Sequence, residues 1–516
     1  MLRLSAKKSR KGFALRVGII LVLLAVFAVG CGGGAEDPTE VPPVEEEPVE
    51  EEPVEEEPTE EPMEEEGEPT EEPMEEEPTE APAEEEEPTE EPAGEETSDL
   101  GGTLNVLGFG QGDEVATVRV DQFEEQYPNV ELNIPDGALD EQQFLTSVAS
   151  GEPPDLIYTN RPSLSTYATR GAIMPMDECV SSMGIDMSQY RQEAVDEVTV
   201  DGVLYGLPEF FNVIIMMMDE DVLAEVGLTA DDIDTSDWDQ IAAVNEQMTL
   251  VEGGELMRIG FDPKLPEFFP LWVHANGGQI LSDDGRTAML NSPEAIEALT
   301  FANSLHEAAG GRQDFIAFRD TWDFFGGNNM FVADQLGAFP MEQWYVSVLG
   351  EVSPDTNVSF KPFVGRDGEI VSFATGNAWA IPVGSQNPEA ACAFAMTMTA
   401  TESWIAAQEE RQRLREEAGQ PPAGIYSGNV AADEIIFGEM VTTTGNENID
   451  QALNVILEVQ AAAFSIPPSP AGAEFRQAWV DGVNRVLNGE QSVEESLNQA
   501  QEEAQSALDE AWADVE

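Results

Sequence analysis

Residues 35–98 repeat short units of proline and glutamate, and this stretch limits where the chain can fold. Units such as PVEEE from Pro48 and PTEE from Pro58 recur along it, and residues 36–99 carry 33 acidic side chains without a lysine or arginine. Frequent proline blocks helices, while dense glutamate repels itself and leaves almost nothing apolar to bury. We therefore expect a disordered tether over residues 32–99, acting as a stalk or as a solubilising tail, and a folded part over residues 100–516.

The first 31 residues have the three parts of a bacterial export signal. Six basic side chains precede an apolar run over residues 17–29, and small residues and Cys31 follow it. The run is short for a membrane-spanning helix, which needs about 20 apolar residues. The segment from Ala28 to Cys31 resembles the lipobox of bacterial lipoproteins, although Ala28 stands where that pattern favours leucine.

These features predict a signal peptide over residues 1–31 and a lipid on Cys31. The protein would then be extracytoplasmic and anchored to the outer face of the bacterial cell membrane. An uncleaved signal anchor, or cleavage without a lipid, are the alternatives.

The folded part is itself strongly acidic. Residues 100–516 carry 70 acidic and 16 basic side chains, which gives a net charge of −54. Binding to nucleic acid or to anionic lipid headgroups needs clustered lysine and arginine, so neither is an expected partner.

Cysteine and histidine are sparse in the folded part. Its cysteines are Cys179 and Cys392, and its histidines are His274 and His306. No spacing typical of a metal site occurs, so we expect neither a metal nor another cofactor. Outside the cytoplasm the two cysteines can pair, but their spacing alone does not decide whether they do.

About 416 residues follow the tether, more than one ordinary core holds, which indicates two domains. Short apolar strands alternate with amphipathic helices in the first part: we predict strands over 103–107, 130–134 and 154–158, and helices over 114–126 and 140–150. Such alternation is typical of a parallel α/β sheet, whose ligands lie beyond the carboxyl ends of the strands. The candidate binding residues selected in this way are Phe109, Gln111, Asp113 and Arg161.

The last part of the chain is predicted to be helical. Residues 471–515 read as two or three helices, with an apolar face at helical spacing. That face consists of Phe475, Trp479, Val483, Val486 and Leu487.

Short motifs follow one another in a fixed order along the folded part. They are FEEQYPNV at 123–130, ASGEPPD at 149–155, DGVLYGLP at 201–208, MDEDVL at 218–223, GG at 277–278, DG at 284–285, NSPEA at 291–295, AIP at 380–382 and SQNPEAA at 385–391. Each motif alone is a weak signal, but together they resemble the extracellular solute-binding proteins, the family that includes maltose-binding protein. The resemblance covers nearly the whole folded part.

This resemblance implies an α/β, two-lobe periplasmic-binding-protein fold (type II-like), in which each lobe is a mostly parallel sheet flanked by helices and a hinge joins the lobes. The chain would cross between the lobes near Pro208 and again near residues 361–363. Lobe 1 is then expected over 100–207 and 364–440, and lobe 2 over 208–363 and 441–516.

The resemblance also implies a function. The protein would be a monomeric solute-binding protein, not an enzyme. It would capture a small molecule, a carbohydrate in our interpretation, by closure of its lobes and deliver it to the permease subunits of an ABC importer.

A sugar presents hydroxyl groups that bind carboxylates, amides and arginine, and flat C–H faces that stack on aromatic rings. Trp344 is the leading candidate for stacking, because the segment FPMEQW is similar to a family segment whose tryptophan often stacks on sugar. The other candidates lie in polar loops, near glycines or next to the predicted crossing, and are Glu209, Phe210, Asn276, Trp322, Asn377 and Trp379. Trp238 and Trp272 fit better as packing residues, and the methionine run 216–218 as a buried strand.

Other ligands and functions remain as alternatives. A neutral mono- or oligosaccharide is the expected ligand, whereas a polyamine or another small cation would suit an acidic cleft, and a polyol is a further candidate. Paired carboxylates occur in glycoside hydrolases, but among 70 acidic residues some pairs lie close by chance, and no nucleophile, metal or phosphate-binding motif accompanies them. A cell-surface carbohydrate-binding adhesin is the alternative without transport.

Overall fold

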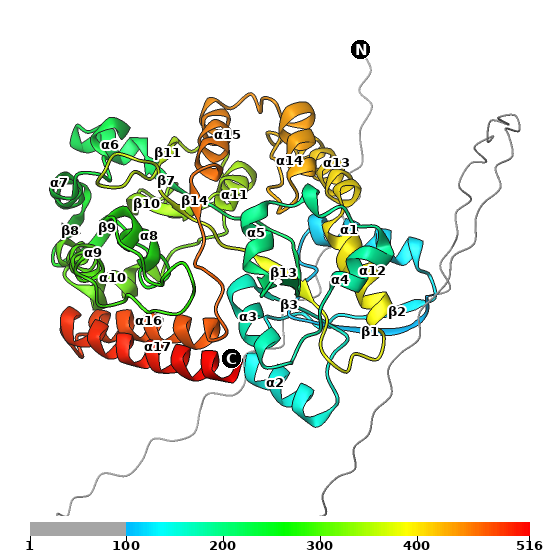
Figure 1. Ribbon diagram of the computed structural model, residues 1–516. Helices are drawn as coiled ribbons and strands as arrows, with labels where there is room; N and C mark the ends of the chain where they lie inside the picture. The colour runs from blue at the N-terminus through cyan, green and yellow to red at the C-terminus, as the bar shows by residue number, and fades with distance from the viewer. Residues whose placement is uncertain (1–99, 516) are drawn as a thin grey trace, which may run out of the picture. The chain divides into compact units, whose positions relative to one another are not determined.

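The computed structural model describes residues 100–515, and within this range two five-stranded sheets are each covered by helices (Figure 1). The first sheet has the strand order β2-β1-β3-β13-β6. Its strands span Gly102–Leu107 (β1), Val130–Asn133 (β2), Leu156–Asn160 (β3), Leu207–Pro208 (β6) and Asn377–Ala380 (β13). β1 pairs in parallel with β2 and β3, whereas β13 runs antiparallel between β3 and β6. A strand from the second half of the chain thus joins a sheet that the first half builds.

The helices associated with this sheet span Glu114–Gln126 (α1), Glu141–Ser150 (α2), Arg161–Thr169 (α3), Asp177–Met183 (α4), Gln192–Glu197 (α5), Pro388–Thr399 (α12) and Thr401–Ala418 (α13). α1 begins after Asp113, whose Oδ1 accepts a hydrogen bond from the backbone N–H of Ala116 (2.8 Å). Its side chains Val120 and Phe123 are buried in one core cluster with Leu104 of β1. The first two predicted strands and both predicted helices of this region are confirmed to within one residue.

The third predicted strand begins two residues later than expected, at Leu156. Asp155 before it accepts hydrogen bonds from the backbone N–H groups of Asn105 (2.9 Å), Gln386 (2.8 Å) and Asn387 (3.0 Å). This buried carboxylate therefore fixes the start of β3 to two neighbouring segments, because each hydrogen bond to a charged acceptor is strong.

The second sheet has the strand order β11-β7-β10-β9-β8. Its strands span Ile214–Asp219 (β7), Leu250–Glu252 (β8), Glu255–Phe261 (β9), Leu336–Glu342 (β10) and Val358–Pro362 (β11). β9 and β10 pair in parallel, but β7 runs antiparallel to β10 and β11, and β8 is antiparallel to β9. The predicted α/β class is confirmed, with more antiparallel pairing than the prediction contained. The tight turn at Gly253 and Gly254 is one reason, since so short a connection can join only antiparallel strands.

β7 contains the methionine run. Ile214, Met216 and Met218 belong to the core cluster on one face of the sheet, whereas Ile215 and Met217 belong to the cluster on the other face. All five side chains are fully buried. A strand covered on both faces reads as a continuous apolar run, so the prediction that this run is a buried strand is confirmed.

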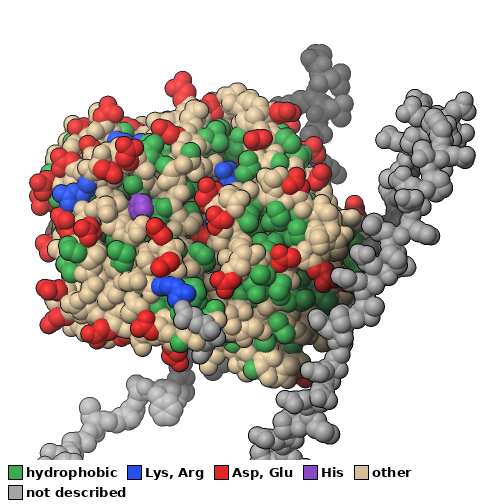
Figure 2. All heavy atoms as spheres, in the orientation of Figure 1, with side chains coloured by type: hydrophobic (Ala, Val, Ile, Leu, Met, Phe, Trp, Pro, Cys, Tyr) green, Lys and Arg blue, Asp and Glu red, His purple; other side chains and the backbone are tan. Residues whose placement is uncertain are grey.

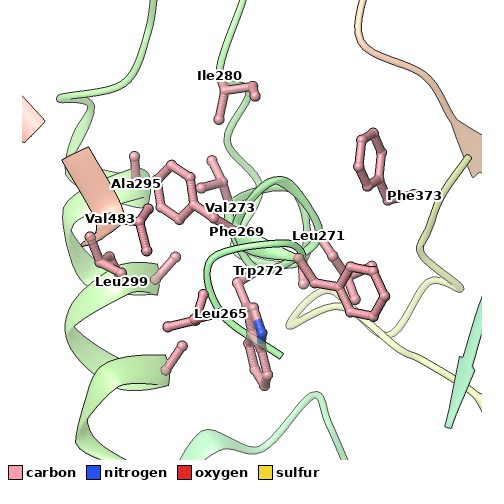
Figure 3. Close-up of a cluster of buried hydrophobic side chains, with 14 of the residues drawn as sticks. Leu265, Phe269, Leu271, Trp272, Val273, Ile280, Ala295, Leu299, Phe373 and Val483 are labelled. Carbon is pink, nitrogen blue, oxygen red and sulfur yellow. The ribbon is translucent and has the colours of Figure 1, made fainter. Parts of the chain in front are cut away.

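The helices around the second sheet span Glu220–Val226 (α6), Trp238–Met248 (α7), Phe269–Ala275 (α8), Pro293–Ser304 (α9), Arg312–Arg319 (α10), Trp344–Val352 (α11), Glu447–Gln460 (α15), Gly472–Leu487 (α16) and Val493–Val515 (α17). Val430–Ile435 (α14) instead packs beside α13. Figure 3 shows Phe269 and Trp272 of α8 beside Ala295 and Leu299 of α9 and Val483 of α16. Trp272 is therefore a core residue. The apolar face predicted for residues 471–515 is buried on α16, and α16 and α17 lie side by side (Figure 1).

The chain passes from β6 to β7 through residues 209–213 and from β11 back to β13 through residues 363–376. Along the second connection, Ser372–Phe373 (β12) pairs with Ala463–Phe464 (β14). The remaining short elements are Thr199–Val200 (β4) and Val203–Leu204 (β5), with helical turns at Met187–Gln189, Ala230–Asp232, Glu307–Ala309 and Ile436–Met440. The two sheets are thus joined by several segments rather than by one linker.

Cys179 of α4 and Cys392 of α12 form a disulfide, with Cα atoms 5.8 Å apart. The predicted signal peptide, Cys31 and the tether lie outside the described residues.

Acidic side chains are scattered over the face shown in Figure 2, where few basic ones are visible. None of the helices in residues 100–515 has the length and apolarity that a membrane span requires.

Candidate functional site

A cleft of about 370 Å³ lies where the two sheets approach each other, and residues from both sides line it. Asn160 at the carboxyl end of β3 and Glu342 at the carboxyl end of β10 are among them. The crossing segments, the loop before α8 and the first turns of α16 supply the other walls. Ligands of α/β proteins bind beyond the carboxyl ends of the strands, and small-molecule sites have volumes of this order. The cleft is therefore the candidate functional site.

Glu342 is fixed in the wall of the cleft by two donors. Its Oε1 accepts a hydrogen bond from Thr375 Oγ1 (2.5 Å), and its Oε2 accepts one from the indole N–H of Trp344 (2.7 Å). Trp344, half-buried at the start of α11, is thereby held directly behind the cleft wall. The structure thus places the leading stacking candidate beside the cleft rather than in its lining.

Lys264 enters the cleft from the loop before α8. Its backbone has a left-handed φ of 54°, and its backbone N–H donates to Asp262 Oδ1 (2.7 Å). Burial, and then the nearby guanidinium of Arg319, lower the pKa of Lys264, while the carboxylates of Asp262, Glu267 and Glu342 act in the opposite direction. A partly desolvated ammonium of this kind gains from any new hydrogen-bond acceptor.

Arg476 on the first turns of α16 also lines the cleft, next to Trp479. Among the lysines and arginines in residues 100–515, Lys264 and Arg476 are the ones whose side chains make neither a hydrogen bond nor an ion pair within the protein. The other lysines and arginines of this range are used in internal contacts. Both free cations therefore stand in the cleft with donors to offer to a ligand.

Arg161 has an internal role, unlike the ligand contact predicted from the sequence. Its side chain is 0% exposed, with Nε donating to Glu197 and Nη1 donating to the backbone carbonyl of Phe210. Burial raises the pKa of Glu197, and Arg161 opposes that shift. Gly376 lies against this guanidinium, and a Cβ there would collide with Arg161 Nη1 and with the Phe210 carbonyl.

Glu209 is also turned inward. Its Oε1 lies 2.6 Å from Arg119 Nη1, and both side chains are buried. Burial raises the pKa of Glu209, and Arg119 opposes the shift. The guanidinium of Arg119 in turn lies 3.9 Å from the ring centroid of Trp404. This pair fixes the start of the crossing segment and leaves Glu209 outside the lining of the cleft.

Phe109 and Trp379 belong to the core of the first lobe. Trp379 is 0% exposed, and its ring centroid lies 4.9 Å from that of Phe109 and 4.6 Å from that of Tyr158. Both rings point into the core, where they pack against each other and against Tyr158. The structure therefore does not bring either ring to the cleft.

The remaining predicted residues are dispersed. Gln111 is exposed, and Asp113 caps α1. Asn276 binds the Glu294 carbonyl and Glu297 Oε2. Trp322 is half-buried against the second lobe.

Phe210 and Asn377 are the predicted residues that line the cleft. Sequence reasoning missed Lys264, Glu267 and Arg476. The strand-end rule would have found Lys264, because it follows the end of β9 by three residues. In residues 100–515, no group of three or more potential metal-ligating side chains is arranged to hold a metal ion.

Residues 119–411 match the family described as bacterial extracellular solute-binding protein. The maltodextrin-binding protein of Bacillus subtilis (strain 168) is 20% identical over 361 residues, which are 68% of this chain and 76% of that protein.

Solved structures share the fold. CpMnBP1 with mannobiose bound is 19% identical, with a TM-score of 0.65 over 78% of this chain and 99% of that one. An ABC substrate-binding protein from Listeria monocytogenes in complex with cycloalternan is 18% identical, with a TM-score of 0.65 over 79% of this chain and 99% of that one. These likenesses confirm the predicted two-lobe α/β fold. With the match over residues 119–411, they show that this chain belongs to the family of bacterial extracellular solute-binding proteins.

Proposed function

We propose that the protein captures a neutral carbohydrate in the cleft and delivers it to the permease of an ABC importer. The observation that supports this most is the composition of the cleft: aromatic rings such as Phe210 and Trp479 stand beside the two free cations Lys264 and Arg476 and beside carboxylates such as Glu342. Sugars need this mixture, because their hydroxyl groups both donate and accept hydrogen bonds and their C–H faces pack on aromatic rings. Similar proteins are named for binding maltodextrin or were solved with mannobiose or cycloalternan bound, which agrees with a carbohydrate ligand.

Each polar group has a role in this proposal. Lys264 and Arg476 donate to sugar oxygens, Glu267 accepts from sugar hydroxyls, and the amide of Asn377 can do both. Because the cleft carries charges of both signs, it provides no single-sign field for a strongly charged ligand.

Closure of the two lobes is part of the proposed mechanism, with the division at 100–207 and 364–440 for one lobe and 208–363 and 441–516 for the other. α3 and α16 touch across the cleft: Ser165 donates to the Ser469 carbonyl, and Thr166 Oγ1 accepts from the backbone N–H of Ala473 (3.1 Å). Such contacts would form when the lobes close, and a ligand that binds the closed form stabilises it by its differential affinity.

Membership of this family implies an extracytoplasmic location. We further propose that a lipid on Cys31 anchors the chain and that residues 32–99 act as its tether. A Cys31→Ser variant would then be released from the membrane fraction into the medium. Equal membrane association of this variant and the unaltered protein would contradict lipid anchoring.

A thermal-shift panel tests the ligand class, because a ligand that binds only the native state raises the melting temperature. The panel would hold maltose, maltotetraose, mannobiose, mannotetraose, glycerol, spermidine and long carbohydrate polymers. We expect a rise with saccharides of at least one series.

The other outcomes separate the alternatives. A response to spermidine alone would favour a polyamine-binding protein. The carboxylates of Glu267 and Glu342 in the cleft would then pair with the ammonium groups of the ligand. A response to polymer alone would favour an adhesin, and release of reducing ends during incubation would indicate a glycoside hydrolase.

A further inference from the structure

Residues 100–515 contain two lysines, Lys264 and Lys361, and their amines differ in what they contact. The Nζ of Lys361 donates to the backbone carbonyls of Ala230 (3.2 Å) and Ile233 (2.8 Å). The Nζ of Lys264 makes neither a hydrogen bond nor an ion pair within the protein, and this residue lines the cleft. Within this range the protein thus presents one uncommitted primary amine, in a cavity of about 370 Å³ that admits a small molecule.

The backbone of Lys264 is held in a costly conformation. Its φ of 54° is left-handed, which a lysine rarely adopts, and the other non-glycine residues of this range with such a φ are Asp201 and Asp334. The backbone N–H of Lys264 donates to Asp262 Oδ1 (2.7 Å), and its carbonyl accepts from the backbone N–H of Phe268 (2.9 Å). Strained residues that their neighbours fix in this way cluster at functional sites, and here the strain fixes where the side chain leaves the backbone.

Apolar rings and a second cation lie beside this amine. The Nζ of Lys264 is 6.0 Å from the ring centroid of Phe268 and 5.9 Å from that of Phe324. Burial, followed by the positive charge of Arg319, lowers the pKa of Lys264, although three nearby carboxylates oppose the shift. A lysine that is desolvated and close to another cation holds more of its neutral form, which is a nucleophile.

We infer that Lys264 is a carbonyl-reactive site, at which the amine condenses with an aldehyde that enters the cleft. The nitrogen lone pair attacks the carbonyl carbon and a carbon–nitrogen bond forms. The carbonyl oxygen then leaves as water with the two hydrogens of the neutral amine, so that an amine and an aldehyde give an imine and water. Glu267 and Glu342 line the same cleft, and their carboxylates can carry the protons from nitrogen to oxygen.

The open-chain form of a reducing sugar is an aldehyde of this kind. A saccharide in the cleft can therefore modify the protein that holds it, and the modified Lys264 would occupy the cleft. The inference goes beyond saccharide capture and does not require it, because any small aldehyde can react.

Reductive labelling of the full chain tests this inference. Glycolaldehyde is the probe, and cyanoborohydride reduces each imine to a stable secondary amine. Mass spectrometry of the digested protein follows the labelled fractions of Lys264 and Lys361 with time, so that Lys361 is a control within the same chain. At pH 7.5 we expect Lys264 to react at least about threefold faster than Lys361. In guanidinium chloride, where the unfolded chain solvates both lysines alike, this ratio should fall to about one.

The variant Lys264→Arg keeps the positive charge but offers no primary amine, so it should lose the fast-reacting fraction of the label and leave the labelling of Lys361 unchanged. Labelling of Lys264 that is no faster than that of Lys361 in the folded protein would refute the reactive amine, while a saccharide response in the thermal-shift panel would still support the proposed function. Selective labelling of Lys264 without a response to any saccharide would support the reactive amine and contradict the proposed function.

Discussion

At the scale of single residues, the chain separates cations that stabilise the fold from cations that can meet a ligand. Arg119 and Arg161 are buried against Glu209 and Glu197, and removing one partner of such a pair leaves an uncompensated buried charge. Lys264 and Arg476 have no such partner and line the cleft. We therefore expect Lys264 and Arg476, rather than the paired arginines, to contact the ligand.

Lys264→Met should weaken saccharide binding about five- to thirtyfold, because a charged donor hydrogen bond of about 1–2 kcal/mol is lost while most of the side-chain volume remains. Calorimetric titration measures the change. Arg413→Met is the control, since Arg413 is paired with Glu410 and Glu417 on the surface of α13. Equal affinities of the Lys264 variant and the unaltered protein would remove Lys264 from the site.

Asp219 gives a prediction for pH. It caps α6 through hydrogen bonds from the backbone N–H groups of Asp221 (3.0 Å) and Val222 (3.1 Å), and burial raises its pKa to about 7. Because the folded state then holds this proton more tightly than the unfolded state, the contribution of Asp219 to stability falls as the pH rises from about 4 to 7. Asp219→Asn keeps an acceptor for the cap but does not titrate.

The melting temperature of the Asp219→Asn variant should consequently rise relative to that of the unaltered protein as the pH increases from 4.5 to 7.5. Calorimetric melting curves at several pH values measure this difference. A constant difference across the range would show that Asp219 does not titrate there.

At the scale of secondary-structure elements, the crossing segment before β13 is tightly packed. Gly376 lies where the guanidinium of Arg161 and the carbonyl of Phe210 leave no room for a Cβ. Gly112, in contrast, has no neighbour within 4 Å of such an atom.

Gly376→Ala should therefore destabilise the protein by about 1–3 kcal/mol, the usual cost of forcing an extra group into a packed site. It should also weaken ligand binding, because Phe210 and Asn377 in the cleft flank the displaced segment. Gly112→Ala should change the melting temperature little. If Gly376→Ala and Gly112→Ala were equally stable, the crossing segment would accommodate a Cβ at residue 376 without strain.

The elements that could be predicted were those with local signals. α1 begins and ends where its apolar spacing predicts, and β7 is buried as its unbroken apolar run predicts. The site was harder, because its side chains are selected by contacts between distant segments. Trp379 follows a glycine before an apolar strand, but whether its ring turns to the cleft or to the core depends on Phe109 and Tyr158.

Arg161 illustrates the same limit. Its partner Glu197 lies 36 residues further along the chain, and no sequence pattern links the two. Phe210 and Asn377 line the cleft: Phe210 follows the predicted crossing near Pro208, and Asn377 follows Gly376. That they bind a ligand stays a prediction.

At the scale of the whole molecule, two sheets joined by several crossing segments enclose one cleft between them. The α3–α16 contacts lie beside that cleft and involve polar groups such as Thr166 and the backbone of Ala473. A ligand that bridges the two walls would add to these contacts and favour closure, with a shift limited by its differential affinity for the closed form. In the proposed division Lys264 and Arg476 both belong to the second lobe, whereas Asn160 and Asn377 line the cleft from the first, so a bridging ligand would contact both sets.

The central claim is that a saccharide binds in this cleft. Calorimetric titration of the full chain with maltotetraose and mannotetraose tests it most directly, run in parallel on the unaltered protein and on Trp344→Ala. We predict binding of at least one of them with one site per chain, weakened by about 1–3 kcal/mol in the variant, because Glu342 then loses the indole N–H that fixes its carboxylate in the cleft wall. No binding of either tetrasaccharide, or binding that Trp344→Ala leaves unchanged, would contradict the account.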